Sequence, residues 1–304
     1  MKSLKILFTI VLLVEIGKPN LFIRAQSGSD DDSDEDIENQ TDFPWNPRWH
    51  FVSPLQSPID VVRCNCREME YEPLIWNYAP SVEKDGIALK ISNTGHGVSI
   101  KIPSEEARPF LSGGMLPGRY LFDNLHLHWG RTDDVGSEHF VDGESYAMEC
   151  HMVTYNSKYS DLNEALNHKD DGVVVFTFFF KLTPNNNEDL QPFLRYVLFI
   201  RETGYNITAL DQDALIWFLN PLEVNDEYLT YPGSLTTPPY TESVVFIILP
   251  EPIRVSSHQL SVMRRLMDNH VPSRPVLDNR RVIQPVNHRP VVCVKGAVEW
   301  NMRY

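Results

Sequence analysis

The chain has 304 residues, of which 42% are hydrophobic and 11% aromatic, and its formal net charge is −14. This length fits one large domain or two small ones, and the apolar content is ample for a packed core. Because the chain is acidic and shows no basic stripe, we expect no nucleic-acid partner. The sequence leaves the oligomeric state open.

The N-terminus has the features of a secretory signal peptide. Two lysines precede the apolar run Ile6–Val14, which is too short to span a bilayer. Residues 1–25 are therefore predicted to be a cleaved signal, with an earlier cut near Gly17 as an alternative. A buried N-terminal helix is the competing interpretation, but the charge run that follows offers it nothing to pack on. Two N-x-[ST] sequons, at Asn39 and Asn206, also favour a secreted glycoprotein.

Residues 26–42 form an acidic, serine-rich segment. It contains the run Asp30–Glu38, whose seven carboxylates equal half of the net charge. Such a segment has too little apolar surface to offset the entropy of ordering, so we predict that it is disordered. Clustered carboxylates also attract calcium, so an acidic matrix protein is an alternative, which is compatible with catalysis elsewhere in the chain.

From Phe43 onward, short runs rich in Val, Ile, Phe and Tyr alternate with Gly, Pro, Asn and Asp clusters, which is typical of strands. Such runs cover residues 86–92, 97–102, 173–180, 194–200, 242–249 and 290–296. Helical patterns are sparse and are found at residues 161–168, 211–219 and 256–268. The last begins with a capping-box pattern, Ser256 and Gln259. Without a repeat or a Gly-rich linker, residues 43–304 are predicted to form one β-rich domain with a few peripheral helices.

One further predicted strand places two histidines on the same face. In the stretch LHLHWG, residues 125–130, side chains alternate between faces, so His126 and His128 share a face with Asn124. The opposite face carries Leu125, Leu127 and Trp129.

A second strand, residues 146–156, repeats this arrangement. Glu149, His151 and Val153 share one face, and Cys150 opposes them. If the two strands pair with these faces aligned, three imidazoles converge. Three neutral nitrogens around an open fourth position are the ligands of a catalytic zinc site, whereas a structural site has four protein ligands. Ordinary core histidines are the alternative interpretation.

Residues close to these histidines can orient them. Metal-bound imidazoles usually donate their other N–H to an acceptor, and Asn124 and Glu149 lie on the right face to accept. The chain also has four cysteines, Cys64, Cys66, Cys150 and Cys293, and their spacing alone leaves the pairing open. No apolar tail follows the last of them, so we expect no C-terminal membrane anchor.

In order and spacing, these segments resemble the metal site of α-class carbonic anhydrases. LHLHWG, GSEHFVDG and MECHMV carry the likeness, and further similar segments lie at residues 56–60, 93–97, 113–120 and 231–242. The resemblance runs from about Trp49 to about Val294. It implies a predominantly β single domain, built on a large, mainly antiparallel twisted central sheet with a few short peripheral helices.

The resemblance implies a zinc lyase that hydrates carbon dioxide reversibly to bicarbonate and a proton through zinc-bound hydroxide. His126, His128 and His151 match the three Zn²⁺ ligands of the family. Asn124 and Glu149 match the residues that hold these ligands.

Other residues match the family's catalytic and substrate-binding positions. Thr236 matches the acceptor of a hydrogen bond from the hydroxide, and Glu138 matches the carboxylate that orients this threonine. His96 matches the proton shuttle, a role that suits a side chain titrating near pH 6.5, although a plain surface-loop histidine is the alternative. The matches to the substrate pocket are Val153, Val175, Leu235 and Thr237.

The chain departs from the family pattern at several positions. Asn124 stands where Gln is more usual, so this shorter amide is expected to reach its histidine less well. The early W-x-Y-G segment is not evident at residues 43–50, and Phe246 replaces a usual Trp.

The cysteines also differ from those of extracellular family members. The usual bridge is absent, because its positions match Phe51 and Tyr240. Family topology instead brings Cys64 or Cys66 near Cys293, and Cys150 is expected to be a buried free thiol. A catalytically silent binding homologue is the main competing function, but such proteins typically lose a metal histidine, and here all three are present.

Overall fold

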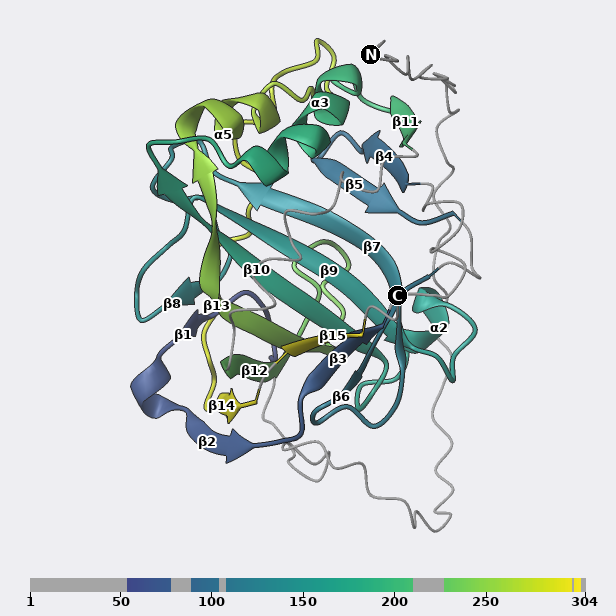
Figure 1. Cartoon of the computed structure of the whole chain (residues 1–304), viewed down its shortest axis with the longest axis vertical. Coiled ribbons are helices and arrows are strands. Elements are labelled where there is room, and N and C mark those ends of the chain that lie inside the picture. The colour runs from purple at the N-terminus through teal and green to yellow at the C-terminus, as the bar shows by residue number, and fades with distance from the viewer. Residues whose placement is uncertain (1–53, 78–88, 104–107, 210–226, 297, 302–304) are drawn as a thin grey trace, which may run out of the picture.

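The computed structural model of the chain describes residues 54–77, 89–103, 108–209, 227–296 and 298–301. Within these residues most of the ordered backbone is β-strand (Figure 1). The strands are β1 (Asp60–Val61), β2 (Arg67–Glu70), β3 (Leu74–Asn77), β4 (Leu89–Asn93), β5 (Val98–Lys101), β6 (Phe110–Gly113), β7 (Tyr120–Trp129), β8 (Phe140–Val141), β9 (Met148–Asn156), β10 (Val173–Thr183), β11 (Asn206–Ala209), β12 (Glu227–Gly233), β13 (Val244–Ser256), β14 (Val292–Lys295) and β15 (Val298–Asn301).

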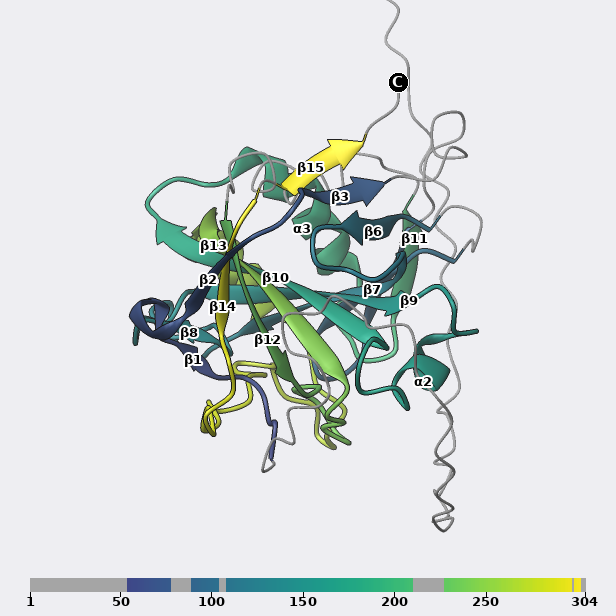
Figure 2. The same cartoon turned by 90° about the horizontal axis from the view of Figure 1, so that it is seen from below.

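One large mixed sheet organises the molecule. Its main path runs β11-β4-β5-β7-β9-β10-β13-β12-β14-β2, and β6, β3 and β15 extend it from β7. Most neighbours are antiparallel, whereas β10–β13, β14–β2 and β15–β3 are parallel. Figure 2 shows the strand direction turning steadily from β7 and β9 to β12 and β14, which is the ordinary twist of a large sheet. The expected β-rich single domain with a mainly antiparallel sheet is confirmed.

The central strands are buried on both faces. In β10, the run VVVFTFFF consists of β-branched and aromatic residues, which pack well on a pleated surface. All eight of these side chains are buried, as are all nine in β9. β10 reads as a nearly continuous apolar run because both faces of the sheet are covered there.

Side chains that point alternately to the two faces of these strands belong to two apolar clusters, one on each face of the sheet. The larger cluster contains Leu125, Leu127, Cys150 and Met152. The smaller one contains Val153, Val175, Phe179 and Phe246. The predicted division of β7 and β9 into two faces is therefore confirmed, and the histidines share their face with the smaller cluster.

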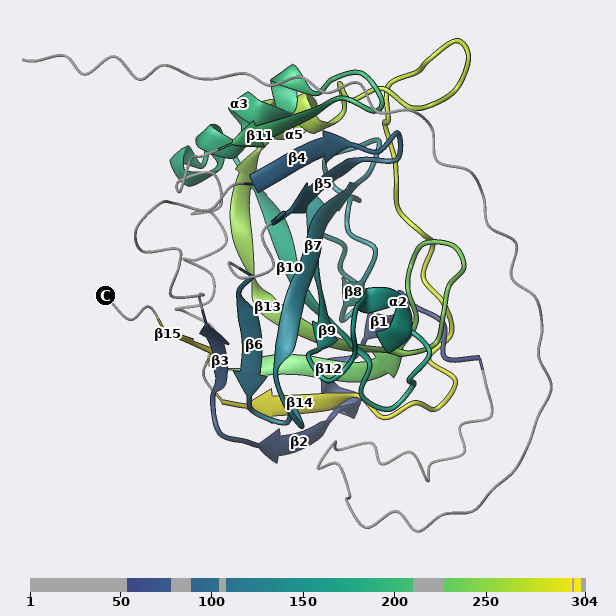
Figure 3. The ribbon, with the colours of Figure 1, turned by 90° about the vertical axis from the view of Figure 1, so that its right-hand side faces the viewer.

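The helices lie at the periphery. They are the short 3₁₀ helices η1 (Arg63–Asn65) and η2 (Glu188–Leu190) and the α-helices α2 (Leu162–Ala165), α3 (Gln191–Phe199) and α5 (Ser257–Met263). Figure 3 shows α3 and α5 together at one end of the sheet and β14 and β2 at the other. The capping box of α5 is present, with reciprocal bonds between Ser256 and Gln259. The helix ends at Met263, earlier than the predicted 256–268.

The prediction of a strand over residues 194–200 is wrong, because this segment lies in helix α3. The helix buries Phe193, Leu194 and Val197, which recur at helical spacing on one face. A seven-residue apolar run has no period that separates a strand from a buried helix face. The missed signal was proline in the first turn, which favours a helix start.

A disulfide joins Cys66 to Cys293, with 5.7 Å between their Cα atoms. Parallel pairing of β2 with β14 brings the two cysteines together. The structure thus selects Cys66 over Cys64, which is exposed and free, and Cys150 is a buried free thiol as expected.

Several predictions lie outside the described residues. These are the signal peptide (1–25), the acidic segment (26–42), the departure at 43–50 and the helix at 211–219. Among the residues that the structure does describe, no helix is both long and apolar enough to cross a bilayer.

Candidate metal centre

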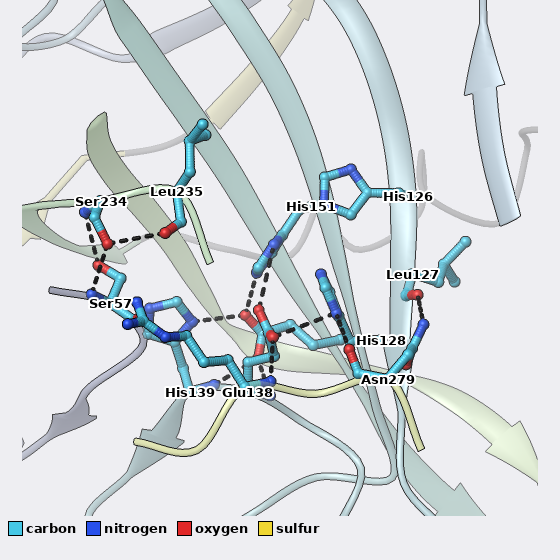
Figure 4. Close-up of polar contacts among 12 residues, drawn as sticks. Ser57, His126, Leu127, His128, Glu138, His139, His151, Ser234, Leu235 and Asn279 are labelled. Carbon is cyan, nitrogen blue, oxygen red and sulfur yellow. Dashed lines mark hydrogen bonds and ion pairs between the residues drawn. The ribbon is translucent and has the colours of Figure 1, made fainter. Parts of the chain in front are cut away.

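Pairing of β7 with β9 brings the three predicted zinc ligands together. His126 lies directly opposite His151 in the antiparallel register, and His128 lies opposite Glu149. The ring centroids of His126 and His128 are 5.1 Å apart, and those of His128 and His151 are 4.7 Å apart. One nitrogen from each of the three rings lies within 4.8 Å of the others, which is compatible with a shared metal ion. Figure 4 shows the rings converging from the two neighbouring strands.

His126 is oriented from its own strand. Its Nδ1 lies 2.9 Å from Oδ1 of Asn124, whose Nδ2 donates to Asp123 Oδ2 at 2.8 Å. The expectation that this shorter amide would reach its histidine less well is therefore wrong. The ladder between β7 and β9 shifts register between Phe122 and Asn124. Such an irregularity re-aims side chains beside a functional site.

His128 is oriented from the far end of the chain. Its Nδ1 lies 3.1 Å from the backbone carbonyl oxygen of Asn279, so this nitrogen is the donor and Nε2 is the nitrogen left for another partner. Nε2 is buried and has no hydrogen-bond partner among the described residues. A buried, unpaired imidazole nitrogen is costly in a folded protein unless something binds it.

His151 is oriented by a carboxylate on the same strand. Its Nε2 lies 2.5 Å from Oε1 of Glu149, which leaves Nδ1 to face the other two rings. The same Oε1 lies 2.6 Å from Nδ1 of His139, and Oε2 accepts from the backbone N–H groups of Glu138 and His139. Glu149 is completely buried and accepts four hydrogen bonds, the full capacity of an ionised carboxylate.

The protonation states suit metal binding. Desolvation lowers the pKa of His126 well below its ordinary value, and the adjacent His128 and His151 lower it further. Desolvation also lowers the pKa of His151, although Glu149 opposes this effect. Both rings are therefore neutral at pH 7. For Glu149, burial acts to raise the pKa, but His139 and His151 outweigh it and hold that pKa well below the usual range.

These observations fit a zinc ion. The free nitrogens are Nε2 of His126, Nε2 of His128 and Nδ1 of His151, because each ring engages its other nitrogen with an oxygen acceptor. Three imidazoles with oriented second nitrogens are the donor set of a catalytic zinc site.

Glu138 and Thr236 are both buried, with 1% and 7% of their surface exposed. Oε1 of Glu138 accepts from the backbone N–H of Arg281 at 2.6 Å. Oε2 is buried and has no hydrogen-bond partner among the described residues. The predicted hydrogen bond from the Thr236 hydroxyl to Glu138 stays a prediction, and Oε2 is the oxygen free to accept it.

The predicted apolar wall lies on the metal face. Val153 and Val175 are direct neighbours in the β9–β10 ladder, and both are buried. Leu235 is half-buried and packs against the same cluster, whereas Thr237 is exposed. Phe246 closes the wall with its ring centroid 5.8 Å from that of His151.

His96 lies on the loop between β4 and β5. It is exposed, and its backbone N–H donates to Thr94 Oγ1 at 3.3 Å. Its carbonyl oxygen accepts from the side chain of Asn279 at 2.9 Å. The loop is thereby tied to the residue that orients His128.

Sequence reasoning missed four residues of this centre: His139, Tyr231, Asn279 and Arg281. His139 Nε2 lies 2.5 Å from the hydroxyl oxygen of Tyr231, which donates to Ser57 Oγ at 2.8 Å. A signal existed for His139, because it directly follows Glu138 in the segment GSEHFVDG. Asn279 and Arg281 lie in an irregular segment with no distinctive pattern, so no local signal identifies them.

Comparison with known proteins agrees with this geometry. The profile of the eukaryotic-type carbonic anhydrase family matches residues 44–295. Human carbonic anhydrase 3 is 36% identical over 252 residues, covering 80% of this chain and 92% of that protein. Mouse carbonic anhydrase 7 is 34% identical over 274 residues, covering 85% and 94%. The chain belongs to the eukaryotic-type, or α-class, carbonic anhydrase family.

Proposed function

We propose that the chain hydrates carbon dioxide reversibly to bicarbonate and a proton, with zinc held by His126, His128 and His151. The observation that carries this proposal is the set of three converging nitrogens, each freed by an oxygen acceptor on the other side of its ring. Zinc bound there supplies a nucleophile at neutral pH by lowering the pKa of water to about 7, a value established for carbonic anhydrases themselves.

The remaining roles fall to the chain's own side chains. Glu138 is held by Arg281 through Oε1 and offers Oε2 to the Thr236 hydroxyl, which then orients the attacking oxygen. The apolar wall around Val153 and Val175 holds carbon dioxide beside the metal without competing for it. His96, exposed on its loop, passes the released proton to solvent.

Metal analysis and stopped-flow hydration test this proposal directly. We expect about one zinc per purified chain and hydration that an aromatic sulfonamide inhibits. His128→Ala should lose zinc and activity, whereas exposed His258→Ala should retain both. Thr236→Ala should keep zinc and lose roughly 100-fold in rate, because orientation of the nucleophile is lost. A zinc-free wild-type protein would instead indicate a silent binding homologue.

We also propose that the chain is secreted. The Cys66–Cys293 disulfide supports this, because structural disulfides persist in oxidising compartments. The predicted signal over residues 1–25 and the sequon at Asn206, on the sheet's edge strand β11, point the same way. Expression in a secretory cell line should release a chain that begins near residue 26 and shifts in mass after glycosidase treatment. Retention of the full chain inside the cell would contradict the proposal.

The acidic segment 26–42 is proposed to be a solvated tail with no part in catalysis. Deleting it should leave kcat and kcat/KM unchanged in stopped-flow hydration. A collapse of activity would show that the segment belongs to the functional domain.

A further inference from the structure

Asn279 makes an unusual number of hydrogen bonds for a residue outside the helices and strands. Its backbone N–H donates to the carbonyl of Trp129 at 3.1 Å, and its Oδ1 accepts from the Trp129 N–H at 2.8 Å. Its Nδ2 donates to the carbonyl of Leu127 at 3.0 Å and to that of His96 at 2.9 Å. Its own carbonyl accepts from His128. Every polar atom of Asn279 is therefore engaged.

These bonds enclose His128 on three sides. Leu127 and Trp129 are its two neighbours along β7, and Asn279 binds the main chain of both while it also binds the imidazole. Asn279 therefore holds both the main chain on either side of His128 and the Nδ1 atom of its imidazole. Figure 4 shows Asn279 beside His128 with its bond to Leu127.

The bond from Asn279 to His96 reaches a segment outside β7. The second Nδ2 hydrogen holds the carbonyl of His96, so the β4–β5 loop is attached to the same side chain that holds β7. Gly97 and the Asn279 amide approach each other closely. A Cβ added to Gly97 would lie 2.7 Å from Asn279 Nδ2, so glycine at position 97 allows this contact. The loop and the metal-ligand strand are thus linked through one amide.

We propose that the Asn279 side chain is a positioning residue that aligns the metal ligand His128 and the proton-transfer residue His96 together. This inference rests on the proposed function for the role of His96. Its claim on the zinc ligand stands separately, because zinc affinity is measurable without activity.

Asn279→Asp is the informative substitution. An aspartate keeps the acceptor for the Trp129 N–H but has no donors, so one carboxylate oxygen would face the carbonyls of Leu127 and His96. The loop then separates from β7, and the strand beside His128 loses one of its fixings. Asn167→Asp is the matched control, because Asn167 is exposed just after α2 and its side chain donates only to the carbonyl of Asn163.

Zinc affinity is measured by chelator competition in the full chain, followed by the absorption spectrum of the cobalt-substituted protein. Residues that support metal ligands usually contribute 10–100-fold to affinity, so Asn279→Asp should bind zinc roughly tenfold more weakly than Asn167→Asp. The cobalt spectrum should change only in Asn279→Asp. Unchanged zinc affinity and an unchanged spectrum would overturn the ligand half of the proposal.

Hydration kinetics test the other half in zinc-saturated protein. Displacement of the His96 loop should lower kcat more than kcat/KM, by up to roughly 100-fold, because a positioned acid–base group contributes about 10²–10⁴-fold. Added imidazole buffer should restore kcat by carrying the proton instead. A merely structural defect would lower both constants together without rescue, and that result would overturn the link to His96. An inactive wild-type protein would contradict the proposed function, but the comparison of zinc affinity between Asn279→Asp and Asn167→Asp would still decide the ligand half of the proposal.

Gly97→Ala serves if Asn279→Asp does not fold. The new methyl group would displace the Asn279 amide, and the φ of +157° at position 97 is one that alanine rarely adopts, so the loop would shift away from Asn279 while Asn279 itself is unchanged. It should give the same loss of kcat with imidazole rescue. Wild-type kcat in a folded Gly97→Ala protein would refute the coupling.

Discussion

Replacing Glu149 with glutamine, which exchanges one carboxylate oxygen for an NH₂ group, should damage the metal centre. In the structure, this carboxylate accepts from the ring of His139, from the ring of His151 and from two backbone N–H groups. A glutamine amide accepts only through its oxygen. If that oxygen faces the two backbone donors, its NH₂ group faces two imidazole N–H groups, and two buried donors lose their acceptor.

The magnitude follows from that count. Each buried donor without a partner costs about 1–3 kcal/mol, so the zinc-free protein should lose about 2–6 kcal/mol of unfolding free energy if both rings keep their protons in place, and about 1–3 kcal/mol if the His151 ring adjusts. His151 can relieve the clash by moving its proton to Nδ1, but Nδ1 is the nitrogen proposed to bind zinc. We therefore expect zinc affinity to fall 10–100-fold, which corresponds to about 1.4–2.8 kcal/mol of binding free energy.

Chelator competition and urea unfolding of the zinc-free protein measure the two effects. Glu144→Gln is the control, because it makes the same chemical change at an exposed residue. The control should shift unfolding by less than about 0.5 kcal/mol. If Glu149→Gln matches the control in both assays, the argument from four accepted hydrogen bonds is wrong.

Two further outcomes are expected. Because folding lowers the pKa of His126 and of His151, the unfolded state binds more protons below about pH 6.5. The unfolding free energy of the zinc-free protein should therefore fall as the pH drops, by up to about 1.4 kcal/mol per pH unit for each histidine, and a flat urea-denaturation profile between about pH 5 and 6.5 would contradict this. Replacing Cys66 and Cys293 with serine should cost about 2–5 kcal/mol in thermal or urea unfolding, and Cys64→Ser, which removes an exposed free thiol, should leave stability unchanged.

The part of the site that could be predicted from the sequence is the part encoded within single strands. Alternation places His126 with His128, and Glu149 with His151, on one face whatever the strand's neighbours are. Asn124 and Glu149, two residues before their histidines, are found by the same rule. Pairing of the two strands then brings the rings together, although residues 130–147, which include β8, separate them along the chain.

The remainder depends on tertiary contacts with no local pattern. Asn279 and Arg281 reach His128 and Glu138 from a segment without helix or strand, and their sequence separation exceeds 140 residues. The apolar run of helix α3 is likewise too short for its period to distinguish a helix from a strand, and proline in the first turn is the one local signal that favours the helix. The β7 irregularity that lets Asn124 reach His126 is likewise invisible in the sequence.

The origins of the three acceptors explain why the whole domain is needed for a working metal centre. Asn124 and Glu149 are present wherever β7 and β9 form, so two ligands are oriented by local structure. The third ligand, His128, is oriented only when the segment around Asn279 has closed over the end of β7. The paired strands β7 and β9 alone would therefore leave the imidazole of His128 free to rotate. We therefore expect tight zinc binding only when the late segment of the chain is in place, which would couple the proposed metal site to folding of the complete sheet.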